Sequence, residues 1–194
     1  MSDEFQSVWL SADEAAHIVR QSYGAVVPTD MRVAESLYDP QEIVWLPASV
    51  KSYALGLGNP IRYAELHVGE IVLDVGSGAG IDTFIAARQV GPSGRAIGVE
   101  MTEAMAARAR RGARAAALAN VEVRDGDAIA LPVDTESADV VITNGVVNLI
   151  PEKETAVREM YRVLKPGGQL LLADIALDSA VSDEARRDID LWTA

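Results

Sequence analysis

The sequence predicts an α/β fold in which a mostly parallel, doubly wound sheet carries helices on both faces, a Rossmann-like architecture. Apolar runs and helical patterns alternate from residue 70 to residue 177, as is typical of parallel sheets. The first of these runs, EIVLDVG, is apolar apart from the glutamate at its start and one aspartate, which favours a strand buried on both faces. A glycine-rich loop follows this run, at the place where such folds bind ligands.

The elements are expected in the following order. A short helix is predicted over 11–23, with Ser11 as N-cap, Glu14 at the capping-box position and Gly24 as its stop. Prolines interrupt residues 25–60, which favours loops with short helices there. Strands are predicted at 70–76, 95–100, 121–126, 138–145 and 169–177. Helices are predicted at 81–90, 102–119, 152–164 and 182–194, with a turn at KPGG, residues 165–168.

Two regions are predicted from this order. Residues 1–60 would form an N-terminal cap of helices and loops, and residues 61–194 the ligand-binding domain. The formal net charge of −12 argues against a nucleic-acid partner, which requires a basic surface. Without cysteine, the chain has no disulfide or thiolate metal site, and no metal is expected. No signal peptide and no membrane span is predicted, so we expect a cytoplasmic protein.

The glycine loop VLDVGSGAG places Gly76, Gly78 and Gly80 between a strand and a helix. A glycine loop alone is weak evidence, and the dinucleotide fingerprint needs its third glycine one residue later, where Ile81 stands. A nicotinamide oxidoreductase is therefore a weak alternative. Asp74 would repel a pyrophosphate at the end of the strand, but it suits a ligand with a cationic amino group. S-adenosylmethionine has such a group beside its sulfonium.

Further polar residues follow the later strands. Glu100 ends the second strand, where a carboxylate can accept hydrogen bonds from ribose hydroxyls; the alternative is a surface acid that caps the strand. Met101 would lie against the adenine, and Asp127 would accept from its amino group or else stabilise a turn. Asn144 ends the fourth strand, either beside the transferred group or as a turn residue.

These residues belong to a wider pattern. VLDVGSGAG, GVEMTEAM, LPVDTESADVVITN and VLKPGG resemble the class I S-adenosylmethionine-dependent methyltransferases. YALGLGNP and NGVVNLIPEK are most similar to the arsenite methyltransferase family. The resemblance implies the class I methyltransferase fold and S-adenosylmethionine as cofactor. It also implies the following cofactor-binding residues: Tyr53, Gly56, Asp74, Gly76, Ser77, Gly78, Gly80, Glu100, Met101, Asp127, Ala128, Asn144 and Asn148.

The sequence lacks the cysteines of the arsenite methyltransferases, and this changes the acceptor that is expected. Arsenite methyltransferases bind arsenic through cysteine thiolates, and Gly145 stands where one of these cysteines would follow Asn144. Soft thiolates are the ligands that such a metalloid needs. We therefore expect methyl transfer to a small-molecule acceptor other than arsenite. No catalytic residue is identified, because His17 and His67 are expected to be structural or exposed.

The end of the sequence raises a question of assembly. In this fold the fifth strand usually precedes a helix and an antiparallel hairpin, and no residues for a hairpin are expected before Ala194. An apolar edge strand is rarely left bare, so a homodimer or a second protein chain is expected, with an interface at strand five or at the last helix with Trp192. The alternative is that the sequence is part of a longer protein, which would cover this edge itself. The alternative function is a methyltransferase-like auxiliary subunit that supports a catalytic partner.

Overall fold

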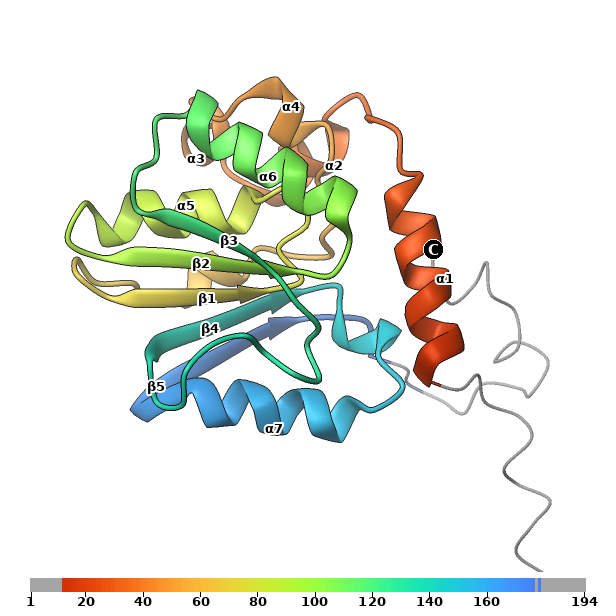
Figure 1. Cartoon of the computed structure of the whole chain (residues 1–194). Helices are drawn as coiled ribbons and strands as arrows, with labels where there is room; N and C mark the ends of the chain where they lie inside the picture. Colours follow the sequence, from red (N-terminus) through yellow and green to blue (C-terminus); the bar gives the residue numbers. More distant parts are fainter. Residues whose placement is uncertain (1–11, 177, 179–194) are drawn as a thin grey trace, which may run out of the picture.

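The computed structural model describes residues 12–176 and 178. Its five parallel strands form one sheet in the order β3-β2-β1-β4-β5, and Figure 1 shows the sheet between its helices. The strands are β1 (Ile71–Val75), β2 (Arg95–Glu100), β3 (Val121–Asp125), β4 (Ala138–Asn144) and β5 (Leu164–Ala173). The order reverses between β1 and β4, and parallel sheets bind ligands at such a point. The predicted fold class is confirmed.

Helices cover the two faces of the sheet. On one face lie α5 (Ile81–Val90) and α6 (Glu103–Ala115), with the short helices α2 (Arg32–Leu37), α3 (Pro40–Ile43) and α4 (Ala48–Lys51) above them. On the other face lies α7 (Lys153–Val163). Two 3₁₀ helices, η1 (Pro60–Tyr63) and η2 (Val147–Leu149), belong to the connections. The short helices predicted within residues 25–60 are confirmed.

Alternate residues of β1 divide the core into two clusters. Val72 is fully buried in the cluster that contains Phe84 of α5 and the residues of α2–α4. Leu73 and Val75 are fully buried in the other cluster, with Met160 of α7. Because successive side chains of a strand point to opposite faces, one continuous apolar run supplies both clusters. This explains the pattern that predicted a strand buried on both faces.

The largest difference from the expected elements concerns the fifth strand. The predicted turn at KPGG lies within β5, because Leu164 already pairs with Ala138 and the pairing resumes between Val140 and Gln169. The intervening residues form an irregular bulge, in which Gly167 has φ +82°. The strand also ends at Ala173 rather than at residue 177. The predicted N-cap Ser11, the helix 182–194 and the question of a hairpin lie outside the described residues.

The N-terminal part of the chain packs on the sheet rather than standing apart. Tyr38, Val50 and Ile61 belong to the same buried cluster as Val72. The boundary predicted at residues 60/61 stays a prediction, since one core joins both sides of it. In residues 12–176 and 178, none of the helices is long and apolar enough to cross a membrane.

Candidate functional site

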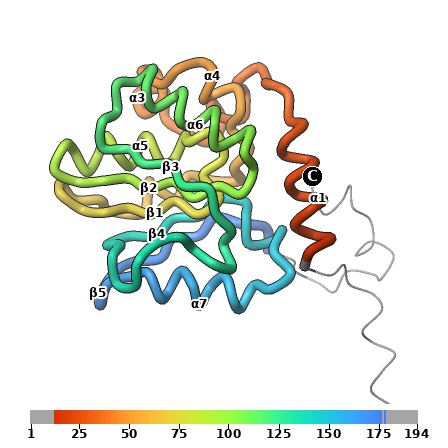
Figure 2. Tube along the Cα trace, viewed as in Figure 1, coloured from red at the N-terminus to blue at the C-terminus, as the bar shows by residue number. Residues whose placement is uncertain are grey.

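Two adjoining cavities lie at the carboxyl ends of the strands, under helix α1 (Ala12–Gly24). Figure 2 shows α1 standing across this end of the sheet. Gly76, Met101 and Val19 of α1 line both cavities, which therefore form one elongated site. The first cavity is also lined by the predicted residues Tyr53, Gly56, Asp74, Ser77, Gly78, Glu100 and Asn144. The second cavity is lined by Asp127 and Ala128.

The glycine loop curves around the first cavity. Gly76 and Gly78 have φ values of +75° and +54°, a region that glycine adopts without the steric cost of a side chain. The N–H group of Gly76 donates to the carbonyl of Val99 at 2.8 Å, so the loop is fixed to β2. Gly80 is the N-cap of α5 with φ +95°, and it does not line either cavity. At Gly76 and Gly78 the loop thus lines the cavity with backbone rather than with side chains.

Asp74 and a second acid, Asp82, are buried at the inner end of the first cavity. The Thr83 hydroxyl donates to Asp74 Oδ2 at 2.5 Å. The Tyr38 hydroxyl donates to Asp82 Oδ1 at 2.8 Å. Burial raises the pKa of Asp74, and the neighbouring charge of Asp82 raises it further. Burial likewise raises the pKa of Asp82, although hydrogen bonds from Asn144 and Tyr38 oppose this.

Glu100 forms a bridge between the glycine loop and the turn after β2. Its Oε2 accepts from the Gly78 N–H at 2.9 Å, and its Oε1 accepts from the Thr102 N–H at 2.7 Å. Burial raises the pKa of this carboxyl, and the two backbone donors oppose the rise. A carboxylate has about four acceptor sites, so both oxygens can still accept from ligand hydroxyls in the cavity.

Asp127, one of three acids that line the second cavity, has two kinds of contact. Asp127 Oδ1 accepts from the Ile129 N–H at 3.2 Å, which is the turn contact expected from the sequence as the alternative. Its Oδ2 lies 3.9 Å from a guanidinium nitrogen of Arg20 on α1. Because the side chain also lines the cavity, the turn geometry and a role toward a ligand are compatible.

Several lining residues were not predicted from the sequence. Asp82 lies in the first turn of α5, and an acid directly after a glycine loop was the available signal. Val19 and Tyr23 reach the site from α1, for which the sequence contains no comparable motif. Asn148 lies outside the lining of both cavities, and its backbone N–H donates to Asp174 Oδ2 at 3.2 Å.

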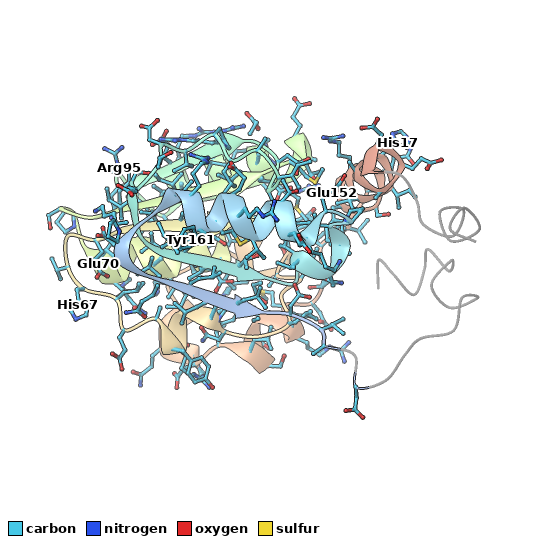
Figure 3. The ribbon with its side chains drawn as sticks, turned by 90° about the horizontal axis from the view of Figure 1, so that it is seen from below. His17, His67, Glu70, Arg95, Glu152 and Tyr161 are labelled. Atoms are coloured by element: carbon cyan, nitrogen blue, oxygen red, sulfur yellow. The ribbon has the colours of Figure 1, made fainter. Side chains whose placement is uncertain are left out.

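The two histidines lie away from the site. Figure 3 shows His17 and His67 at opposite ends of the molecule. Both are exposed, and His67 Nδ1 lies 3.4 Å from Glu70 Oε1. Within residues 12–176 and 178, no three His, Asp or Glu side chains are grouped so as to hold a metal ion.

The charges of the site favour a cationic ligand. Asp74, Asp82 and Glu100 line the first cavity, and no Lys or Arg is among the described residues that line it. Burial raises the pKa of all three acids, and the charges of Asp82 and Glu100 raise the pKa of Asp74 further. A positive charge between them would favour their ionised forms. A pyrophosphate, which is anionic, would instead be repelled by these carboxylates. S-adenosylmethionine fits this donor set, because it combines an ammonium and a sulfonium with a ribose and an adenine.

Comparisons with known proteins agree with this geometry. A family model described as a methyltransferase domain matches residues 66–192. The arsenite methyltransferase of Halobacterium salinarum is 44% identical over 156 residues, which cover 80% of this chain and 40% of that protein. The demethylmenaquinone methyltransferase of Listeria welshimeri is 39% identical over 114 residues, which cover 59% of this chain and 48% of that protein.

The comparison with solved structures also finds methyltransferases. The chain superposes on the arsenic(III) S-adenosylmethionine methyltransferase of Chlamydomonas reinhardtii with a TM-score of 0.67 and 33% sequence identity. The match covers 82% of this chain and 53% of that one. The chain spans less than half the length of the two curated relatives named above.

Proposed function

Since the chain belongs to the methyltransferase domain family, we propose that it binds S-adenosylmethionine and transfers its methyl group to a small-molecule acceptor. That the chain belongs to this family confirms the resemblance to S-adenosylmethionine-dependent methyltransferases that the sequence showed. The observation that carries the proposal is the first cavity, where three buried carboxylates and a glycine loop meet without a lining Lys or Arg among the described residues. The nicotinamide alternative is disfavoured by the same carboxylates, which would repel a pyrophosphate.

The proposed roles of the residues follow from their places. Asp74 and Asp82 would take the amino group, and the backbone at Gly76–Gly78 would follow the methionine part. Glu100 would accept from the ribose hydroxyls, while Met101, Asp127 and Ala128 would surround the adenine. Tyr53 and Gly56 would close the first cavity. The bound cofactor supplies an electrophilic methyl group, so positioning and exclusion of water are what the protein must add.

The acceptor is proposed to be a small molecule other than arsenite. The 194 residues contain no cysteine, and the position after Asn144 is Gly145, whose φ is +70°. A side chain there would meet Leu57 at 3.4 Å and would be strained by this backbone conformation. Gly145, Val146 and Leu149 line the cavity, which favours a neutral acceptor with apolar surface over an anion.

Turnover of labelled S-adenosylmethionine tests this function. The purified chain is incubated with a panel of phenols, quinols, amines and thiols, and separately with arsenite plus glutathione. We expect label transfer to a member of the panel and none to arsenite, with the Halobacterium salinarum enzyme as positive control for arsenite. Methylated arsenic above the enzyme-free background would refute the exclusion of arsenite. Cofactor binding without any transfer would favour the alternative, an auxiliary subunit.

A pH dependence follows from the raised pKa values of Asp74 and Asp82. At pH values between the ordinary carboxyl pKa and the raised values, these carboxyls are protonated in the folded, cofactor-free protein and ionised in the unfolded chain. Their contribution to stability is therefore fully present below the ordinary carboxyl pKa and is lost as pH rises through the raised values. Bound S-adenosylmethionine favours the ionised acids, so its affinity rises over the same range, by up to about tenfold per pH unit for each proton released.

Thermal unfolding with and without S-adenosylmethionine, between about pH 5 and pH 8.5, measures both effects. We expect the stabilisation by the cofactor to increase with pH. Asp139→Asn serves as a control, because this acid is paired with Lys165 at 2.8 Å at the opposite end of β4. A cofactor effect that is constant over this range would contradict the proposed protonation of the two acids.

We also propose that β5 takes part in an interface with a second copy or another chain. Leu170 and Leu172 are 39% and 48% exposed on this edge strand, and Ile175 after it is 54% exposed. An exposed apolar edge favours pairing. The predicted contribution of Trp192 lies outside the described residues.

Light scattering at micromolar concentration is expected to show a stable dimer or, with a co-purified partner, a stable complex. Leu170→Lys and Leu172→Lys together should dissociate it, because they place charges on the proposed contact. Val68→Lys is the matched control, since Val68 is exposed and lies before β1, away from β5. A monodisperse monomer of the wild-type chain would rule out an obligate interface.

A further inference from the structure

The side-chain amide of Asn144 at the end of β4 pairs with a loop far away in the sequence. Its Oδ1 accepts from the N–H groups of Leu57 and Gly58 at 2.8 and 3.2 Å. Its Nδ2 donates to the Gly58 carbonyl at 2.8 Å. One side chain therefore satisfies both backbone groups of Gly58, as a neighbouring strand would do.

Gly56 makes this pairing possible. A Cβ at position 56 would overlap the amide nitrogen of Asn144, so the segment Leu55–Gly58 can lie against this side chain only with glycine there. The backbone at Gly56 does not require a positive φ, and the requirement is therefore one of space alone. The glycines of LGLGNP and the asparagine of ITNG are thus parts of one structural unit.

The same amide continues to the acids of the site. Asn144 Nδ2 donates to Asp82 Oδ2 at 3.0 Å, while the Tyr38 hydroxyl donates to Asp82 Oδ1. Asp82 lines the first cavity, and so do Leu55 and Gly56. Two walls of one cavity, separated by the amide, are joined through a single, partly buried network of hydrogen bonds.

We infer that Asn144 is a positioning residue that holds segment Leu55–Gly58 as a wall of the cavity and fixes this wall to Asp82. Its polar atoms are occupied by the wall and by Asp82, so its part is to set the distance between the wall and the acid rather than to take part in the transfer. The inference rests on the proposed function only for the identity of the ligand in the cavity.

Amide hydrogen exchange of the cofactor-free protein tests the inference directly. Asn144→Ala should accelerate exchange at Leu57 and Gly58 by about tenfold or more, because both amides lose their acceptor. Gly56→Ala should do the same while keeping Asn144, because the added methyl group displaces the amide. Gly24→Ala is the matched control, since its added methyl group would lie no closer than 3.9 Å to Thr102. The Leu118 amide, which donates to Ala113, reports any general loss of stability.

Binding kinetics of S-adenosylhomocysteine separate positioning from general damage. In both variants the association and dissociation rates should rise together, several-fold, because a detached wall admits and releases ligand more easily; ordinary contact mutations act mainly on dissociation. Unchanged exchange at Leu57 and Gly58, or a rise in the dissociation rate alone, would overturn the inference. If the wild-type chain does not bind S-adenosylhomocysteine, the proposed function fails, and the exchange result still decides the role of Asn144.

Discussion

Asp74→Asn is expected to weaken S-adenosylmethionine binding by roughly 10- to 100-fold and, at the same time, to stabilise the cofactor-free protein. The loss of affinity follows because a buried carboxylate that faces a cationic amino group is replaced by a neutral group. The gain in stability follows because burial, together with the charges of Asp82 and Glu100, raises the pKa of Asp74, so folding at neutral pH requires this carboxyl to take up a proton. An asparagine is buried without this cost, and its isosteric amide can still accept from Thr83.

Calorimetry for binding and thermal unfolding without cofactor measure the two effects on the same samples. Asp139→Asn is again the matched control. It replaces the charged partner of Lys165 by a neutral amide that keeps one acceptor oxygen for the Ile71 N–H group, so it should lower stability and leave cofactor affinity unchanged. If Asp74→Asn retained full affinity, the proposed place of the amino group would be wrong. If it weakened binding but also destabilised the protein, the acid would be structural.

The local part of this site could be predicted from the sequence, because its chemistry and its position are encoded side by side. Asp74, the glycine loop and Glu100 stand directly at the ends of apolar runs, and parallel strands bring their carboxyl ends to the same edge. The parallel sheet could be predicted from the same apolar runs. The turn signal at KPGG marked a real irregularity with Gly167 at positive φ, but sequence alone did not show that Leu164 already pairs with Ala138.

The long-range part could not be predicted in this way. Asp82 is held by Tyr38, 44 residues before it, and by Asn144, 62 residues after it. No local pattern connects such residues, because packing of the cap onto α5 and β4 creates their contacts. The position of Asn144 beside the site could therefore be predicted from the sequence, but its pairing with Leu57 and Gly58 depends on tertiary packing.

Gly76→Ala is expected to destabilise the protein by about 2–6 kcal/mol and to abolish detectable cofactor binding. Two separate costs combine. Gly76 has φ +75°, where a residue other than glycine is strained by about 1–3 kcal/mol. The new Cβ would also overlap the side chain of Val146, and overpacking of this kind typically costs about 1–3 kcal/mol.

The double variant Gly76→Ala, Val146→Ala separates these costs. Removal of the Val146 methyl groups relieves the overlap but leaves the backbone strain, so denaturant unfolding should show recovery of only part of the lost stability. Cofactor binding should stay impaired, because Gly76 lines both cavities and its Cβ would stand beside the path between them. Gly24→Ala is again the control without strain or overlap. Full recovery of binding in the double variant would mean that Val146, rather than the backbone of the glycine loop, sets the shape of the site.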